Sequence, residues 1–139
     1  MEESILAATF QAIGNICFAA KEDRYGCERK QHAVSLGCLE AVCTGMQNAP
    51  ESQWVQEAGC IAIGSLCNGT DPDGHYRRTH ALTMGAIEFA LRVSRVYDPR
   101  VAIASHKEAY TAAVHTIRAV AESDAKGRSH DGYHGPPVW

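Results

Sequence analysis

Six cysteines are the first residues of this chain whose type and spacing suggest chemistry. Cys38 and Cys43 are five positions apart, and Cys60 and Cys67 are seven apart, which places the second pair on one face of a helix. A tetrahedral zinc site needs four converging ligands, usually seeded by a pair with about two to four residues between them. Cys38 and Cys43 nearly meet that spacing, but no second Cys or His pair accompanies them. We therefore expect reduced thiols that fill space between close helices, and no metal site.

A second candidate metal site lies near the end of the chain. His130 and His134 are four positions apart, with Asp131 between them, and such a set suits a transition metal when a helix fixes its geometry. The surrounding sequence is rich in glycine and contains two consecutive prolines, which is typical of a segment without regular structure. We therefore predict a flexible C-terminal tail over residues 124–139 that binds no metal. Trp139 in this tail is a candidate docking residue.

Neither a calcium site nor a catalytic centre is indicated by the remaining polar residues. Residues 71–74, with the sequence DPDG, resemble the start of a calcium-binding loop but lack the third acidic ligand and the later glutamate. No motif of a serine hydrolase, zinc protease, P-loop protein or dinucleotide-binding enzyme is present, and no spacing pairs a nucleophile with a base. We predict that the chain is not an enzyme and binds no cofactor. The alternative is a helical enzyme or cofactor chaperone that uses the cysteines.

Composition and charge narrow the class of partner. The chain has 139 residues, 45% of them hydrophobic, and a net charge of −3. No stretch approaches the ~20 apolar residues that a membrane-spanning helix needs, so we predict no membrane span. The small negative charge does not favour nucleic acid, which leaves a protein as the expected partner. The acidic start, Glu2-Glu3, differs from the basic beginning of a signal peptide, so we predict an intracellular protein of the cytoplasm or nucleus.

The sequence repeats itself with a period of about 50 residues. Matching segments occur in the same order in two copies, and a third copy is weaker. Even a pair of basic residues recurs. The matches are residues 12–17 with 62–67, 29–30 with 77–78, 32–40 with 80–88, 56–58 with 107–109, and 62–63 with 113–114.

Each repeat is predicted to contain a short helix, a glycine turn, a second helix and a long third helix. Apolar residues at helical spacing predict a long helix over residues 53–67, after Pro50, with Glu51 and Ser52 suited to a first turn or cap. A short helix over residues 76–84 is predicted to end at Gly85, where a left-handed residue turns the chain. The next helix covers residues 86–96, and polar loops are expected over residues 21–25 and 68–75.

This organisation resembles the armadillo repeat family over roughly residues 4–122. The block around Gly37 is similar to the junction of that family's first and second helices, and residues 9–17 and 56–67 resemble its long third helix. The resemblance implies an all-α fold, a right-handed α-solenoid of armadillo-like three-helix repeats within residues 1–123. HEAT repeats, with two helices each, are the nearest structural alternative. The predicted units are the third helix of repeat one at 2–20, repeat two at 27–68 and repeat three at 76–123.

In this family the third helices line a concave groove that holds a partner chain. The resemblance places the family's peptide-binding asparagines at Asn15, Ser65 and Thr116, so only the first keeps the residue type. The tryptophan positions of the family correspond to Gln11, Ile61 and Ala112, and none of them is a tryptophan. We therefore expect a weakly polar surface for a protein partner rather than an importin-like groove. Its predicted residues are Gln11, Asn15, Ile61, Ser65, Ala112, His115 and Thr116.

The alternative function is a structural subunit or fragment of a larger multi-protein assembly. The first repeat lacks its own first two helices, and its remaining helix carries Ile5, Leu6 and Phe10, which are apolar enough to require cover from a neighbouring subunit. The basic pairs Arg29-Lys30 and Arg77-Arg78 leave two interpretations open. They either form a ridge for an acidic partner, or they pack against the preceding repeat or lie in solvent.

Overall fold

A computed structural model describes residues 2–18, 24–69, 71–98, 100 and 107–122. Every regular element in these residues is helical, which confirms the predicted all-α class. The predicted tail over residues 124–139, including His130, His134 and Trp139, lies outside the described residues. The elements are α1 (Glu3–Cys17), α2 (Arg24–Ser35), α3 (Cys38–Asn48), α4 (Gln53–Cys67), α5 (Gly74–Thr83), α6 (Ala86–Val96), α7 (Lys107–Ile117) and the π-helical turn η2 (Arg118–Glu122).

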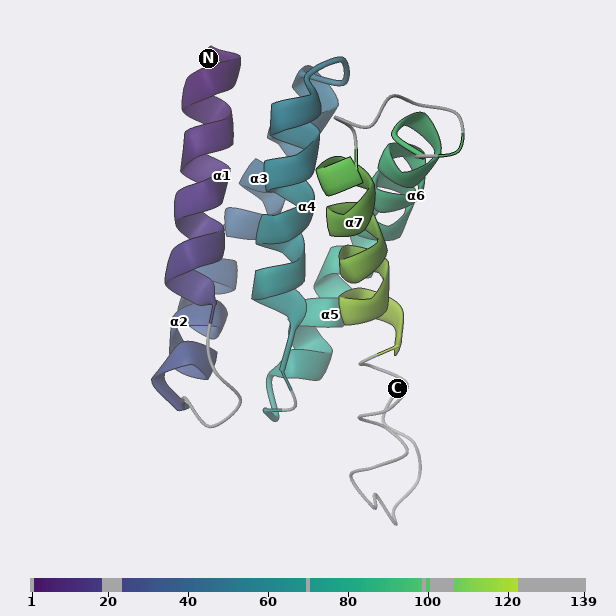
Figure 1. Cartoon of the computed structure of the whole chain (residues 1–139). Helices are drawn as coiled ribbons and strands as arrows, with labels where there is room; N and C mark the ends of the chain where they lie inside the picture. Colours follow the sequence, from purple (N-terminus) through teal and green to yellow (C-terminus); the bar gives the residue numbers. More distant parts are fainter. Residues whose placement is uncertain (1, 19–23, 70, 99, 101–106, 123–139) are drawn as a thin grey trace.

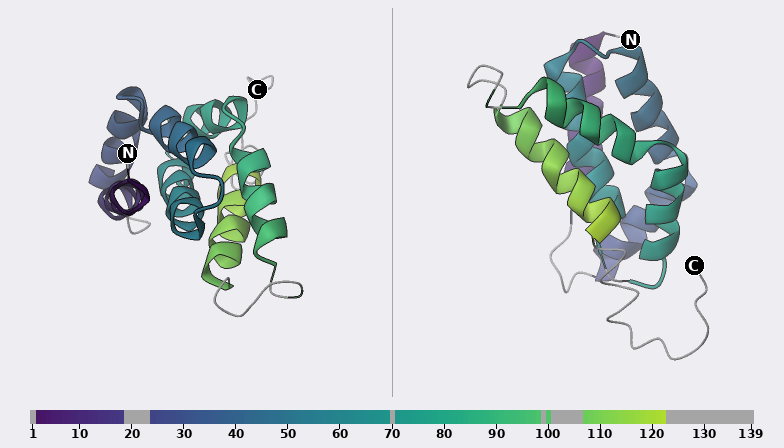
Figure 2. Two further views of the ribbon diagram at one scale, coloured as in Figure 1. Left: turned by 90° about the horizontal axis from the view of Figure 1, so that it is seen from above. Right: turned by 90° about the vertical axis from the view of Figure 1, so that its right-hand side faces the viewer.

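The long helix α4 stands between α1 and α7 and packs against both (Figure 1). Seen from above, α2 and α3 lie behind α1 and α4 of this row (Figure 2). Helix α6 lies beside α7. The core lies between the row and the helices behind it, where Leu39, Met46, Ile63 and Leu66 are fully buried. Because α4 has neighbours on both sides, most of its residues are buried.

Two glycines turn the chain between consecutive helices at equivalent places in the repeats. Gly37 has φ 91° and joins α2 to α3, and Gly85 has φ 82° and joins α5 to α6. Side chains on a Cβ atom disfavour this left-handed conformation, so glycine is required by the backbone itself. The predicted left-handed turn at Gly85 is confirmed.

Helix ends predicted from local signals agree well with the structure. The helices predicted over residues 53–67 and 86–96 are α4 and α6 with the same bounds. Of Glu51 and Ser52, which were predicted to suit a first turn or cap, Ser52 caps α4, since its side chain accepts a hydrogen bond from the Val55 amide at 3.3 Å. The predicted loop over residues 68–75 is too long, because residues 71–74 form a turn that leads directly into α5 at Gly74. The loop predicted over residues 21–25 ends earlier than predicted, since α2 begins at Arg24.

Glycines also let the long helices approach one another at repeated positions. A Cβ atom on Gly14 of α1 would lie 3.8 Å from the Ser65 hydroxyl of α4. A Cβ atom on Gly64 of α4 would lie 3.6 Å from the Thr116 hydroxyl of α7. These two pairs occupy matching positions of successive repeats, so α1 meets α4 much as α4 meets α7.

Candidate protein-binding surface

Four of the predicted site residues come together where α1 meets α4. Gln11 and Asn15 are exposed on α1, Ile61 is 43% exposed on α4, and Ser65 is half-buried one turn further along. Gly14, which precedes Asn15 and follows Gln11 by three positions, marks the contact, since its Cβ position lies 3.3 Å from Ile61 and 3.8 Å from Ser65. These neutral side chains offer amide and hydroxyl groups beside an apolar one, which suits the backbone and side chains of a bound polypeptide.

Trp54 belongs to the same edge of α4, although the sequence reasoning did not single it out. It lies seven positions before Ile61, which is two helical turns, and 64% of its surface is exposed. Tryptophan is enriched among residues that dominate binding energy at protein interfaces. The signal available in the sequence was the helical spacing of residues 54, 61 and 65. Together Gln11, Asn15, Trp54, Ile61 and Ser65 form what we call the α1–α4 seam.

Three predicted site residues on α7 do not join this seam. Thr116 is 1% exposed, and its hydroxyl lies 2.5 Å from the Cys60 carbonyl and 2.9 Å from the Ala112 carbonyl. Ala112 is also buried, because this edge of α7 packs against α4. The prediction that these two residues face a partner is therefore wrong. His115 is exposed, but it takes the position equivalent to Gly14 and Gly64, on the edge of α7 away from α4.

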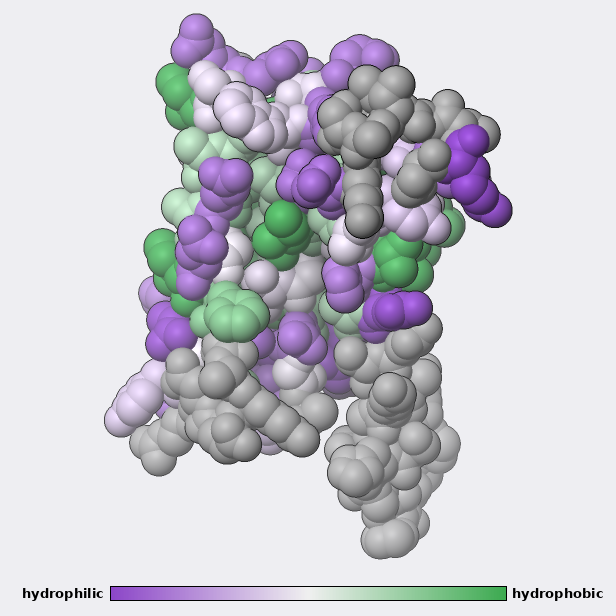
Figure 3. All heavy atoms as spheres, in the orientation of Figure 1, coloured by the Kyte–Doolittle hydropathy of each residue, from purple (hydrophilic) through white to green (hydrophobic). Residues whose placement is uncertain are grey.

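The surface in the orientation of Figure 1 mixes hydrophobic and hydrophilic residues (Figure 3). Acidic groups border it on the α7 side. Burial raises the pKa of Glu57 on α4, and the nearby carboxylate of Glu108 on α7 raises it further. A bound segment that brings an acidic side chain to this border would therefore meet repulsion.

Lys30, Arg77 and Arg78 of the basic pairs are buried and Arg29 is half-buried, so the pairs do not form an exposed ridge for an acidic partner. Arg29 donates to the Ile16 carbonyl at 2.8 Å, and Arg77 donates to the Leu66 carbonyl at 2.7 Å. In both repeats the arginine of a short helix thus binds the last turn of the preceding long helix, where carbonyl groups lack partners. Arg78 similarly reaches the Gly69 carbonyl at 2.7 Å. The interpretation that these residues pack against the preceding repeat is correct.

One carboxylate balances this buried positive charge. Asp71 contacts both terminal nitrogens of Arg77, at 2.7 and 2.8 Å. Burial alone would raise the pKa of Asp71, but the hydrogen bonds and charge of Arg77 outweigh it and hold that pKa below its usual value. Lys30 donates to the Asn68 carbonyl at 2.9 Å, and burial together with Arg77 lowers its pKa. The DPDG segment is therefore an ion-paired turn that fastens α4 to α5.

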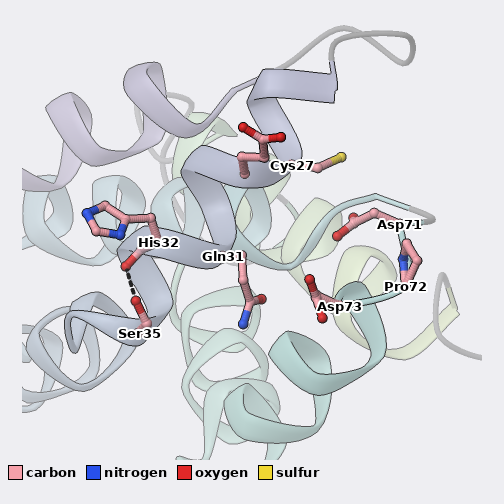
Figure 4. Close-up of a pocket in the computed structure, with 8 residues that line it drawn as sticks. Cys27, Gln31, His32, Ser35, Asp71, Pro72 and Asp73 are labelled. Atoms are coloured by element: carbon pink, nitrogen blue, oxygen red, sulfur yellow. Dashed lines mark hydrogen bonds between the residues drawn. The ribbon is translucent and has the colours of Figure 1, made fainter.

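A cavity of about 490 Å³ lies between α2 and this turn (Figure 4). Cys27, Gln31, His32 and Ser35 approach it from α2, while residues 71–73 line the other side. Burial raises the pKa of the Cys27 thiol, and the Asp71 carboxylate raises it further, so this thiol is not activated as a nucleophile. The sequence reasoning did not identify this cavity, because its two walls are about 40 residues apart in the chain.

The other cysteines are free thiols placed among the helices. Cys43, Cys60 and Cys67 are buried, and burial raises their pKa to about 11, about 12 and about 12. Protonated, buried thiols are poor nucleophiles. Within the described residues no three His, Cys, Asp or Glu side chains are grouped so that they could hold a metal ion.

The apolar residues of the first helix that were expected to need cover are only partly exposed. Phe10 is 2% exposed and Leu6 is half-buried, because both pack against α3 near Gly45. The prediction that Phe10 needs a neighbouring subunit to cover it is therefore wrong. Ile5 is 53% exposed, and Ile16 on the same helix is 61% exposed.

Comparison of the chain with protein-family models, curated proteins and solved structures gave no match. None of the described helices combines the length and the apolar character that crossing a membrane requires.

Proposed function

We propose that this chain is a short armadillo-like α-solenoid that binds a partner protein through the α1–α4 seam. The repeated left-handed glycines, Gly37 and Gly85, support the repeat architecture. So do the matching bonds of Arg29 and Arg77 to the preceding long helices. Right-handed stacking of three-helix repeats is part of the proposal.

The observation that carries the proposed function is the exposure of Trp54 and Ile61 on one edge of α4. These side chains lie two turns apart, and the neutral polar residues Gln11 and Asn15 of α1 flank Gly14, which contacts α4 at Ile61. A large aromatic and an aliphatic anchor with uncharged hydrogen-bonding groups on the α1 side is the composition of a protein interface centre.

The geometry favours an extended, uncharged segment as the bound element. Such a segment has unpaired backbone amides and carbonyls, which Gln11, Asn15 and Ser65 can satisfy with donors and acceptors. Its apolar side chains would cover Trp54 and Ile61. The chemistry of the partner is thus a mainly apolar peptide without acidic residues near the α7 border.

Random peptides displayed on phage provide a direct test. Peptides selected on the wild-type chain are then measured against Ile61→Lys and against Gln47→Lys. Ile61 is on the seam, whereas Gln47 is exposed on α3, which lies behind α4. We expect Ile61→Lys to weaken binding at least about tenfold, as the loss of an interface anchor does, and Gln47→Lys to leave it unchanged.

Two outcomes would contradict the proposal. One is that no selected peptide distinguishes Ile61→Lys from wild type. The other is that Gln47→Lys weakens binding as strongly as Ile61→Lys. Circular dichroism of both variants separates loss of binding from loss of fold, because each substitution replaces an exposed side chain by a good helix former.

A structural subunit remains the second candidate function, supported by the exposure of Ile5 and Ile16 on α1. These residues lie on a different edge of the helix from Gln11 and Asn15. A subunit contact through them and a peptide bound to the seam therefore involve separate surfaces.

A further inference from the structure

The outer edge of α1 carries the same pattern of apolar side chains as the edge of α4 that packs against α1. On α4 this pattern is Val55, Ala58, Ala62 and Leu66, which are 0, 2, 0 and 0% exposed. A Cβ atom on Gly14 would lie 3.9 Å from the Cα atom of Ala62, so this edge of α4 faces α1. The pattern is therefore a helix-packing stripe whose partner helix is seen in the structure.

The same stripe occurs 50 residues earlier, on α1. Its members are Ile5, Ala8, Ala12 and Ile16, which match the α4 stripe position by position in size and apolar character. All four are exposed. In Figures 1 and 2 α1 stands at the edge of the molecule with α4 on one side only. We name these four residues the α1 stripe.

In the third repeat the residues that match the middle of the α1 stripe are also buried. Ala109 and Ala113 of α7 match Ala8 and Ala12, and both are 0% exposed where α7 packs on α4. Two of the three copies thus meet a helix, and the remaining copy faces outward on α1.

The charge distribution of α1 agrees with a buried role for this edge. Residues 4–18 contain no charged side chain, although about half of that helix is exposed. The exposed edge of α7, in contrast, carries Glu108 and His115. A long exposed helix edge without charge is unusual for a surface that remains in water.

We propose that the α1 stripe pairs with the α1 stripe of a second copy of this chain, antiparallel across a twofold axis. The side chains of the stripe are large at both ends and small in the middle. An antiparallel copy therefore places Ile5 of one chain opposite Ile16 of the other. Ala12 then meets Thr9, and the small central side chains let the helices approach closely. The pairing continues the row of long helices, with the α1 stripe packed on a second α1 stripe, whereas the α4 stripe packs on the edge of α1 that carries Gly14.

Charge and packing favour this symmetric pairing over a head-to-tail stack. A head-to-tail contact would place α7 of one copy on α1 of the next, and His115 stands where Gly14 and Gly64 allow close approach in the other two repeats. The antiparallel arrangement also brings Glu3 of one copy towards the end of the other α1, where Arg29 binds the Ile16 carbonyl.

One helix edge makes a small interface, at the low end of the range for specific protein contacts, so we expect a dissociation constant on the order of micromolar. Sedimentation velocity from about 1 μM to about 300 μM spans that range. We expect wild type to change from monomer to dimer, Ala12→Arg to remain monomeric throughout, and Gln47→Arg on α3 to behave as wild type. Unchanged circular dichroism shows that Ala12→Arg, an exposed helix position, keeps its fold.

A photo-crosslinking amino acid in place of Ile5 tests the orientation. The proposal requires crosslinks to residues near 16 of the other copy, identified by mass spectrometry. Crosslinks near residue 5, crosslinks to another surface, a monomer at every concentration, or a dimer that survives Ala12→Arg would each overturn it. Peptides selected on the α1–α4 seam should bind Ala12→Arg as they bind wild type, so failure of the dimer and failure of the proposed function are separate results.

Discussion

The buried guanidinium of Arg77 holds both carboxylate oxygens of Asp71, at 2.7 and 2.8 Å. The arginine side chain is 0% exposed and the aspartate 13% exposed. The same arginine donates to the Leu66 carbonyl at the end of α4. The Arg77 side chain therefore connects α4, the turn at residues 71–74 and α5. These bonds hold the chain in place where one repeat ends and the next begins.

Replacing Asp71 with asparagine leaves the Arg77 charge buried without its counterion. We expect Asp71→Asn to lower the free energy of unfolding by about 3 kcal/mol, as for other buried pairs that lose one partner. Urea denaturation followed by circular dichroism measures the change. Asp73→Asn, an exposed aspartate in the same turn, serves as the matched control and should leave the midpoint unchanged. Equal effects from the two variants would show that the ion pair does not stabilise the fold.

The same pair predicts how stability depends on pH. The pKa of Asp71 is lower in the folded protein than its ordinary value of 3.8. Its contribution is therefore fully present above pH 3.8 and is lost as the pH falls through the lowered folded value. We expect wild type to lose more stability than Asp71→Asn when urea denaturation is repeated at successively lower pH below 4. Parallel losses in the two proteins would contradict this assignment.

Two glycines that face neighbouring helices should respond to alanine in opposite directions. A Cβ atom on Gly45 of α3 would overlap the Phe10 ring, whereas one on Gly64 of α4 meets the Thr116 hydroxyl at an ordinary 3.6 Å. We expect Gly45→Ala to destabilise the chain by about 1–3 kcal/mol through overpacking. Gly64→Ala should stabilise it by up to about 1 kcal/mol, because alanine is the better helix former. Thermal unfolding of the two variants measures both changes in stability. A Gly45→Ala variant more stable than Gly64→Ala would contradict the packing of α1 on α3.

The thiols should divide into two groups by their reaction with iodoacetamide. Cys27 and Cys38 are half-buried, whereas Cys17, Cys43, Cys60 and Cys67 are buried. Since burial also raises the pKa of Cys60 and Cys67 to about 12, their thiolate fraction at neutral pH is negligible. We expect native protein to be alkylated at Cys27 and Cys38 only, and all six positions to react in urea. Peptide mass spectrometry reports each site, and rapid native alkylation of Cys60 would argue for the alternative in which the cysteines perform chemistry.

Local signals in the sequence predicted the parts of the fold that depend on local structure. The bounds of α4 and α6 and the left-handed Gly85 follow from helical spacing, capping residues and the conformational freedom of glycine. The start of α5 was missed because the turn at residues 71–74 is stabilised by Arg77, a contact that no local pattern contains.

The candidate site was predicted less well because repeat alignment does not fix the rotation of a helix. Asn15, Ser65 and Thr116 occupy matching positions, yet the first is exposed and the last donates to the Cys60 carbonyl inside the α4–α7 contact. The burial of the basic residues was similarly hidden. Arg77 can be fully buried because the Leu66 carbonyl at the end of α4 and the Asp71 carboxylate both accept its hydrogen bonds. The recurrence of Arg29 and Arg77 in both repeats was nevertheless visible in the sequence.

The most direct test of the proposed function is to map a selected peptide on the chain by nuclear magnetic resonance. The backbone amides of the ¹⁵N-labelled protein are recorded while the peptide is added. The proposed function predicts that the largest chemical-shift changes of the amides fall on the α1–α4 seam, at Gln11, Asn15, Trp54, Ile61 and Ser65. Shifts concentrated on α3 and α6, with the seam unchanged, would contradict it.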